Sequence, residues 1–417
     1  MKVLVIGSGG REHAICSSLN KSKRIDKLYC APGNGGISQI AECVDISATD
    51  VGAMVAFAKE TPVDFVVVAP DDPLAIGMVD ALEAAGVRAM GPCKAAARLE
   101  SSKVYAKDIM NRYGIPTADY RIFTDAGEAK EYARKYGAPL VVKADGLALG
   151  KGVVVANDIQ TAIDAIDMIM LDKKFGESGS RIIIEECMTG PEVTVLAFTD
   201  GETIAAMPSA QDHKRVFTGN IGPNTGGMGA FSPSPVYTDE IADICMKTII
   251  RPTIDAMNSE GIPYKGVLYF GLMVTSEGPR VVEYNARFGD PEAQVVLSLL
   301  ETDLLDIFEA IADRRLNEQT IEWRDGCACC VVMASGGYPG DYEKGYRITG
   351  LDAVPEYIEV FHAGTARSGD GFVTNGGRVL GVTAMGASLD IASARAYEGV
   401  ACINFIKSQY RTDIGAL

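Results

Sequence analysis

The chain has 417 residues, 47% of them hydrophobic and 23% charged, with a formal net charge of −16. This composition is typical of a globular protein with a sizeable core, and its acidic balance argues against general nucleic-acid binding. No apolar run approaches the ~18 residues of a membrane helix, and the short apolar start does not fit a signal peptide. With ten scattered cysteines, we expect a cytoplasmic protein without nucleic-acid or membrane partners.

The first hundred residues alternate apolar strands with helical segments. We predict strands at 3–6 and 63–69 and helices at 11–20 and 73–85. This βαβ alternation is typical of a parallel sheet. A predicted helix over 103–113, followed by Gly114-Ile-Pro116, marks the boundary of this α/β segment.

The rest of the chain has an α+β pattern and then becomes β-rich. We predict a glycine-, proline- and asparagine-rich loop over 217–235 and a β-rich region after Cys327 that ends in a helix near 391–408. Cys327-Ala-Cys329-Cys330 runs into an apolar stretch, so we interpret it as a buried strand. The other expected strands are 140–143, 153–156, 181–186, 192–198, 268–275 and 280–287, and the other helices are 160–171, 239–260 and segments within 291–313.

The segment Val281–Glu292 carries the strongest functional signal. Alternate residues of a strand share one face, so Glu283, Asn285 and Arg287 are expected to point the same way. A carboxylate and an amide oxygen suit Mg²⁺, and a guanidinium beside them would face the anion that the metal holds. Asp290 and Glu292 follow in a turn. The segment predicts a metal–phosphate site, with a solvated strand face as the alternative.

Two glycine-rich turns suit phosphate binding. In Gly7-Ser-Gly-Gly-Arg11, Glu12 occupies the third glycine position of the dinucleotide motif, which disfavours NAD and leaves phosphate binding by bare N–H groups or a plain tight turn. Asp145–Gly152 has strands on both sides and no Ser or Thr after the lysine, so it is not a Walker A loop. It predicts either a hairpin over ATP phosphates, with Lys143 and Lys151 meeting oxygens, or an ordinary hairpin.

Two further segments combine charge with a flexible backbone. The long loop containing Asp212–Arg215 and Gly222–Gly229 suits an anionic ligand that makes many hydrogen bonds. The turn Glu185–Glu192 could contact an adenine edge and ribose hydroxyls, with a solvated turn as the alternative. None of the three histidines has the context of a catalytic triad, and no nucleophile for acyl-enzyme chemistry is visible.

Taken together, these segments resemble the ATP-grasp ligases and, within them, the glycinamide ribonucleotide synthetase family. The resemblance implies an α/β and α+β multidomain protein: a parallel α/β N-terminal (pre-ATP-grasp) domain over 1–102, an ATP-grasp domain over 103–322 with a mobile subdomain at about 118–190, and a β-rich C-terminal domain over 323–417. The motifs that carry it are Gly7–Ala14, Ala31–Asn34, Lys143–Ala148, Gly150–Val153, Gln211–Arg215, Gly222–Ala230, Arg287–Glu292, Ser335–Gly340, Phe361–Thr365 and Thr374–Gly381.

The resemblance implies the second step of de novo purine biosynthesis. Glycine would be ligated to 5-phospho-D-ribosylamine through a glycyl phosphate, giving glycinamide ribonucleotide, ADP and phosphate. The implied cofactors are ATP and Mg²⁺ (or Mn²⁺), and a transient contact with the enzyme that supplies phosphoribosylamine is left open. Another ATP-grasp enzyme, such as a carboxylase or peptide-type ligase, and a non-enzymatic nucleotide-binding regulator remain alternatives.

The resemblance also implies residue roles. Glu283 and Asn285 would hold the metal, and Arg287, Asp290 and Lys143 would be catalytic. ATP would be held by Lys103, Lys143, Gly150, Lys151, Gly152, Glu185, Glu186, Met188 and Glu192. The other substrates would meet Gly9, Gly10, Arg11, Asn34, Asp212, Lys214, Asn224, Thr225, Gly226, Gly227, Arg287 and Asp290. One departure is the absence of a carboxylate at Phe270–Leu272, where many ATP-grasp enzymes carry a further metal ligand.

Overall fold

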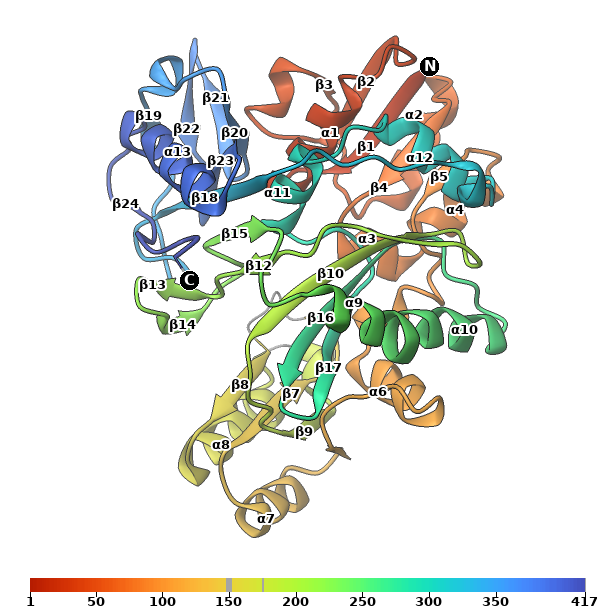
Figure 1. Ribbon diagram of the computed structural model, residues 1–417, viewed down its shortest axis with the longest axis vertical. Helices are drawn as coiled ribbons and strands as arrows, with labels where there is room; N and C mark the ends of the chain where they lie inside the picture. The colour runs from red at the N-terminus through yellow and green to blue at the C-terminus, as the bar shows by residue number, and fades with distance from the viewer. Residues whose placement is uncertain (148–151, 175, 417) are drawn as a thin grey trace.

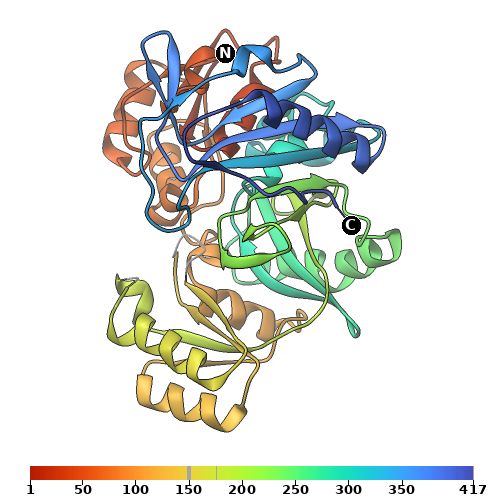
Figure 2. The same cartoon turned by 90° about the vertical axis from the view of Figure 1, so that its left-hand side faces the viewer.

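The computed structural model describes residues 1–147, 152–174 and 176–416. In Figure 1 the N-terminal sheet and the C-terminal sheets lie side by side at the top, above the central sheet, and a separate lobe lies at the bottom. Figure 2 shows the same arrangement from the side. Within the described residues, no helix is long and apolar enough to cross a membrane.

The N-terminal region is a five-stranded parallel sheet, as predicted, with strand order β3-β2-β1-β4-β5. The single helix predicted over 73–85 is wrong, because Gly77 adopts a φ of +95° and separates α3 from α4. The elements are β1 (Lys2–Gly7), α1 (Gly10–Leu19), β2 (Lys27–Pro32), β3 (Glu42–Cys43), α2 (Val51–Glu60), β4 (Phe65–Val68), α3 (Asp71–Ile76), α4 (Met78–Ala84), β5 (Ala89–Met90) and α5 (Arg98–Ser101).

Both faces of this sheet are covered, which explains its continuous apolar strands. On β1, Leu4 and Ile6 pack with residues of α2 and α4, whereas Val3 and Val5 pack with α1 and with two helices from later in the chain. Those later helices are α11 (Glu292–Ser298) and α12 (Leu304–Ala312). The helix that follows the Arg287–Asp290 turn therefore packs against α1 and shares the apolar core on this face of the sheet.

The lobe is an antiparallel sheet of order β6-β9-β7-β8 with its own apolar core. This core is separate from the apolar clusters of the other regions. Its elements are β6 (Tyr120–Phe123), α7 (Ala126–Tyr136), β7 (Leu140–Ala144), β8 (Val153–Ala156), α8 (Ile159–Ile166) and β9 (Ile182–Glu186).

The central sheet is antiparallel, with strand order β11-β10-β16-β17. It lies next to the lobe (Figure 1). Residues of both sheets line the cavity described below. Its elements are α6 (Lys103–Arg112), β10 (Glu192–Thr199), β11 (Ile204–Ala206), α9 (Asp239–Cys245), α10 (Arg251–Ser259), β16 (Gly266–Thr275) and β17 (Gly278–Asn285).

The C-terminal sheet includes two strands from the middle of the chain, because β15 pairs with both β12 and β18. Cys329 and Cys330 are buried in β18, as predicted. The remaining elements are β12 (Gln211–Asp212), β15 (Gly229–Ser232), β18 (Cys327–Ser335), β19 (Arg347–Ile348), β20 (Ile358–His362), β21 (Thr365–Ser368), β22 (Gly371–Thr374), β23 (Arg378–Gly386), α13 (Leu389–Cys402) and β24 (Ser408–Gln409).

The prediction of an irregular loop over 217–235 is wrong. Strands β13 (Arg215–Phe217) and β14 (Ile221–Asn224) form a hairpin, and β15 follows it. Gly219 and Asn220, which lie in the turn between the two strands, both have positive φ and provide the tight connection. Because one of the two partners of β15, strand β18, lies about a hundred residues further along the chain, the local pattern does not reveal this strand.

Candidate functional site

One cavity of about 680 Å³ lies where the lobe, the central sheet, the N-terminal turn and the C-terminal loops meet. Gly9, Gly10, Asn34 and Gly227 lie outside its lining, and Gly150 and Lys151 lie outside the described residues. The predicted site residues that line it are Arg11, Lys103, Lys143, Gly152, Glu185, Glu186, Met188, Glu192, Asp212, Lys214, Asn224, Thr225, Gly226, Glu283, Asn285, Arg287 and Asp290.

The Glu283/Asn285 pair lies at the end of β17. Burial raises the pKa of Glu283, but Lys214, Lys103 and Lys143 outweigh burial and hold that pKa below its usual value. The Glu283 carboxylate is therefore ionised, which suits a group that coordinates a metal cation. Among the residues that the structure describes, no group of three or more His, Cys, Asp or Glu is arranged for a metal. The pair suits Mg²⁺, which takes few protein ligands and keeps waters and phosphates as the others.

The neighbouring strand has a glycine where the further carboxylate is absent. Gly271 of β16 pairs directly with Glu283, and a Cβ added there would lie 3.2 Å from Glu283 Cγ. A side chain at this position would therefore crowd the predicted metal ligand.

Two buried lysines share one carboxylate at the lobe side of the cavity. Lys143 Nζ lies 2.8 Å from Glu185 Oε2, and Lys107 Nζ lies 3.3 Å from Glu185 Oε1. Burial lowers the pKa of Lys107 to about 8. The group carries an excess positive charge when Lys107 is protonated, which suits a phosphate. We did not identify Lys107 from the sequence, although it follows Lys103 by one helical turn on α6 and so shares its face.

The glycine-rich hairpin is attached to α6. Lys103 Nζ donates to Gly146 O at 3.0 Å, and the Asp145 carboxylate accepts from Ser102 Oγ and Val104 N, both at 3.1 Å. Burial lowers the pKa of Lys103. These contacts direct Lys103 toward the base of the hairpin.

A second charge cluster surrounds Lys214, whose Nζ lies 2.5 Å from Glu192 Oε2. Burial raises the pKa of Asp212 to about 7, although Lys214 opposes the rise. Glu292 is buried nearby and accepts from Thr194 Oγ1 at 3.4 Å. This corner can hold a cationic or hydrogen-bonding group beside the predicted metal ligands.

Arg287 is held by an acid that sequence reasoning missed. Arg287 Nη2 lies 2.7 Å from Glu100 Oε1, and Glu100 Oε2 accepts from Ala286 N at 2.7 Å. Burial raises the pKa of Glu100 to about 7, against the opposing charge of Arg287. No motif marks Glu100, because its partners lie far along the chain.

In the N-terminal turn, the backbone N–H of Gly9 already has a hydrogen-bond partner, whereas the sequence predicted N–H groups free to bind phosphate. Gly9 N donates to Glu12 Oε2 at 2.5 Å, and Arg11 Nε donates to Glu12 Oε1 at 2.5 Å. Glu12, which occupies the third glycine position, thus caps its own helix and orients Arg11. Arg11 Nη1 also donates to Phe288 O at 3.2 Å. This bond connects the turn to the Arg287–Asp290 segment.

The Asn34 side chain is fully used in hydrogen bonds to the backbone. Its Nδ2 donates to Ser8 O and His362 O, both at 2.8 Å, and its Oδ1 accepts from Gly36 N and Ile37 N, both at 2.9 Å. Both amide hydrogens are thus used to join the N-terminal turn to the C-terminal region.

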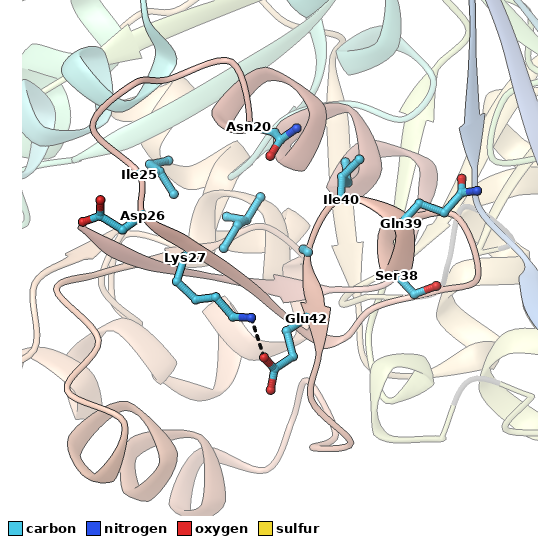
Figure 3. Close-up of a pocket in the computed structure, with 10 residues that line it drawn as sticks. Asn20, Ile25, Asp26, Lys27, Ser38, Gln39, Ile40 and Glu42 are labelled. Atoms are coloured by element: carbon cyan, nitrogen blue, oxygen red, sulfur yellow. Dashed lines mark ion pairs between the residues drawn. The ribbon is translucent and has the colours of Figure 1, made fainter.

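A second hollow, of about 400 Å³, lies at the outer edge of the N-terminal sheet (Figure 3). Lys27 and Glu42, whose charged atoms lie 2.7 Å apart, face each other there. None of the predicted site residues lines it. We therefore place the candidate site in the larger cavity.

The fold, with Lys103 and Lys143 lining the same cavity as the Glu/Asn pair of β17, defines an ATP-grasp enzyme. Models of phosphoribosylglycinamide synthetase match nearly the whole chain: the N domain matches residues 1–100, the ATP-grasp (A) domain 101–293 and the C domain 328–417. The chain belongs to the phosphoribosylglycinamide synthetase family.

Individual relatives agree with this assignment. A phosphoribosylamine–glycine ligase of Brucella melitensis is 49% identical over 417 residues, covering 100% of this chain and 97% of the relative. The crystal structure of a phosphoribosylamine–glycine ligase from Thermotoga maritima superposes with a TM-score of 0.86 at 33% identity, covering 99% and 100% of the two chains.

A more distant neighbour shares the fold alone. The biotin carboxylase domain of a Hydrogenobacter thermophilus 2-oxoglutarate carboxylase has a TM-score of 0.77 at 16% identity, covering 98% of this chain and 91% of that one. That protein was crystallised with MgADP and bicarbonate.

Proposed function

We propose that this chain ligates glycine to 5-phospho-D-ribosylamine at the expense of ATP, giving glycinamide ribonucleotide, ADP and phosphate through a glycyl phosphate. The observation that carries the proposal is the single cavity in which Lys103 and Lys143 face Glu283 and Asn285, with Arg287 beside them. The family assignment supports this reaction over that of a carboxylase. In this role the enzyme performs the second step of de novo purine biosynthesis in the cytoplasm.

The reaction needs charge neutralisation and positioning more than a catalytic base. Lys103 and Lys143 would hold ATP phosphates, and Arg287 would face the phosphoryl group as its charge develops. Glu283 and Asn285 would hold Mg²⁺ or Mn²⁺. When bound, the metal supplies positive charge at the phosphate oxygens.

The remaining roles are those that membership of the family implies, both for residues that line the cavity and for residues beside it. Residues of the lobe and of the turn after it would hold the nucleotide: Glu185, Glu186, Met188 and Glu192, with Gly150, Lys151 and Gly152 of the hairpin. Residues toward the N- and C-terminal sheets would hold glycine and phosphoribosylamine: Gly9, Gly10, Arg11, Asn34, Asp212, Lys214, Asn224, Thr225, Gly226, Gly227 and Asp290.

We also propose the division into parts at 1–102, 103–322 and 323–417, with 118–190 as a lobe that closes over the nucleotide. The separate core of the lobe supports this motion. Its hinge side is held by Thr117 Oγ1, which donates to Val281 O at 2.6 Å, and by Arg280, which pairs with Glu186 at 3.0 Å. Closure would exclude water from the labile acyl phosphate.

The decisive experiment measures ADP release with ATP, Mg²⁺ and glycine, with and without freshly generated phosphoribosylamine. We expect sustained release only when both substrates are present, together with formation of glycinamide ribonucleotide. ATP binding without turnover under every combination would instead identify a nucleotide-binding regulator. Turnover with a different acceptor would contradict the substrate assignment but retain the ligase chemistry.

A further inference from the structure

Arg378, the first residue of β23, connects the C-terminal sheet to two loops of the site. Its Nη1 donates to Gly226 O at 2.7 Å and to Asp290 O at 2.6 Å, and its Nη2 lies 3.0 Å from Asp290 Oδ2. A longer contact of 3.4 Å reaches Gly227 O. One planar guanidinium therefore fixes the backbone of both loops and one carboxylate, a geometry that lysine cannot reproduce.

The glycine pair in the first loop makes this contact feasible. A Cβ added to Gly226 would lie 3.1 Å from the guanidinium carbon of Arg378. A Cβ added to Gly227, whose φ is +113°, would lie 2.5 Å from Pro291 Cδ. The two glycines thus allow Arg378 and the Asp290-Pro291 turn to approach the same piece of backbone.

Tyr338, from the loop after β18, holds the other side of the same peptide. Gly226 N donates to Tyr338 Oη at 3.0 Å, while Gly226 O accepts from Arg378. Residues of the C-terminal region therefore bind both polar groups of Gly226.

The Asp290 carboxylate that Arg378 holds faces the N-terminal turn. Its oxygens would lie 3.4 Å and 3.5 Å from Cβ atoms added to Gly9 and Gly10, respectively. Its Oδ1 also accepts from Gln294 Nε2 at 2.8 Å. Although burial raises the pKa of Asp290, Arg378 and Arg11 outweigh burial and keep that pKa below its usual value. An ionised, oriented acceptor is thus maintained at the junction of the three regions.

These contacts are separate from the nucleotide side of the cavity. In the part of the chain that the structure describes, Lys103, Lys143 and Glu185 make no hydrogen bond or ion pair with Arg378. A change at Arg378 should therefore alter the loops without altering the lysines that face ATP.

We propose that Arg378 is a positioning residue for the amine acceptor: it sets Asp290 and the Gly226–Gly227 backbone so that phosphoribosylamine meets the glycyl phosphate. This inference rests on the proposed function, because it assigns the acceptor side of that same site. Arg378 acts through Asp290 and the two glycines.

The test compares Arg378→Lys and Arg378→Gln with the parent enzyme and with Arg347→Gln. Arg347 also lies in the C-terminal region, but its side chain is 70% exposed and its ion pair with Asp370 is long, at 3.9 Å. Two affinities are measured by calorimetry, that for ATP and that for glycinamide ribonucleotide, which is the product and carries the acceptor's phosphoribosyl group. The KM for phosphoribosylamine and kcat are measured in parallel.

We expect Arg378→Gln to weaken glycinamide ribonucleotide binding by about tenfold or more and to raise the KM for phosphoribosylamine similarly. Arg378→Lys should recover part of this loss, and ATP affinity should stay within about twofold of the parent value. Arg347→Gln should match the parent in every measurement. If the Arg378 variants do not fold, Tyr338→Phe, which removes one bond to Gly226, should show the same split with a smaller effect.

Unchanged affinity for glycinamide ribonucleotide in a folded Arg378→Gln variant would overturn the inference. An equal loss of ATP affinity would also overturn it, because a general structural defect produces that result.

The measurements on the parent enzyme distinguish failure of the proposed function from failure of the role of Arg378. A parent that neither turns over with glycine and phosphoribosylamine nor binds glycinamide ribonucleotide rejects the proposed function and the Arg378 role together. A parent that does both, with variants that keep parent values, rejects only the role of Arg378.

Discussion

The two sides of the cavity are built differently. On the side where we propose that ATP binds (the nucleotide side), charged side chains project from strands of the lobe and of the central sheet, as with Lys143 on β7, Glu185 on β9 and Glu283 on β17. On the side where we propose that the amine acceptor binds (the acceptor side), the parts are loops whose backbone is held by distant side chains, chiefly Arg378 on Gly226 and Asp290. The nucleotide side depends on charge, whereas the acceptor side depends on the path of the backbone.

This difference indicates which substitutions separate the two sides. Removing a charge on the nucleotide side should slow the phosphoryl transfer step itself. The protein contributes to that step mainly by positioning the reactants and neutralising their charge, rather than by covalent chemistry. Disturbing the acceptor loops should affect one substrate and leave the nucleotide bound normally. The predictions below test this contrast.

The largest effect is expected from Glu283→Gln, which removes the charge of the predicted metal ligand at nearly constant volume. We expect turnover to fall by more than about a thousandfold, because phosphate charge would no longer be neutralised. Glu277→Gln is the control, since Glu277 lies in the adjoining turn with its side chain 81% exposed. Mg²⁺-dependent turnover near the parent rate in a folded Glu283→Gln variant would remove Glu283 from the metal site.

Arg287→Ala should be next in size. We expect kcat to fall by about a hundredfold or more, with a much smaller change in ATP affinity, because the guanidinium matters most as phosphoryl charge develops. Steady-state kinetics with each substrate varied in turn measures the split. A rise in KM with kcat unchanged would contradict the role and would put Arg287 among groups that only bind substrate.

Gly226→Ala tests the acceptor side through its backbone. The new methyl group would press on Arg378, and we expect the KM for phosphoribosylamine to rise by about tenfold while the KM for ATP stays near the parent value. Gly52→Ala is the matched control, because a Cβ there meets only Asp50 Oδ1, at 3.8 Å. If ATP and acceptor affinities fell together, the two sides would not be separable.

The smallest effect is a pH dependence at Glu100, the buried partner of Arg287. Burial raises the pKa of Glu100 from 4.5 to about 7, so the folded protein keeps a proton that the unfolded chain releases. Its contribution to the free energy of unfolding is therefore complete below pH 4.5 and is lost as the pH rises through about 7.

Glu100→Gln removes this titration. Relative to the parent, the variant's free energy of unfolding should increase as the pH rises from about 5 to 7.5, by up to about 3 kcal/mol. Urea unfolding of both proteins across this range measures the difference. A difference that stays constant with pH would contradict the protonation of Glu100 in the folded state.

The same contrast explains what the sequence could reveal. The alternation of side chains along one strand is sufficient to predict that Glu283 and Asn285 lie on the same face. The alternation of apolar strands with helices is sufficient to predict the parallel N-terminal sheet. Arg378 was inaccessible to such reasoning, because its partners Gly226 and Asp290 lie 152 and 88 residues away. Glu100 was missed for the same reason, and Gly77 divides a helix whose apolar pattern continues across it.

The pairing of β15 with β18 has a consequence for how the protein is made. Gly229 and Ala230 lie opposite Val331 and Cys330, so β15 acquires this neighbour only after the ribosome has added the residues between them. Until then the strand has an unpaired edge, a feature that promotes aggregation. A nascent or truncated product that ends in the central sheet would therefore expose this edge to pairing with other chains. Splitting the gene between residues 103–322 and 323–417 would give two fragments that each lack part of one sheet.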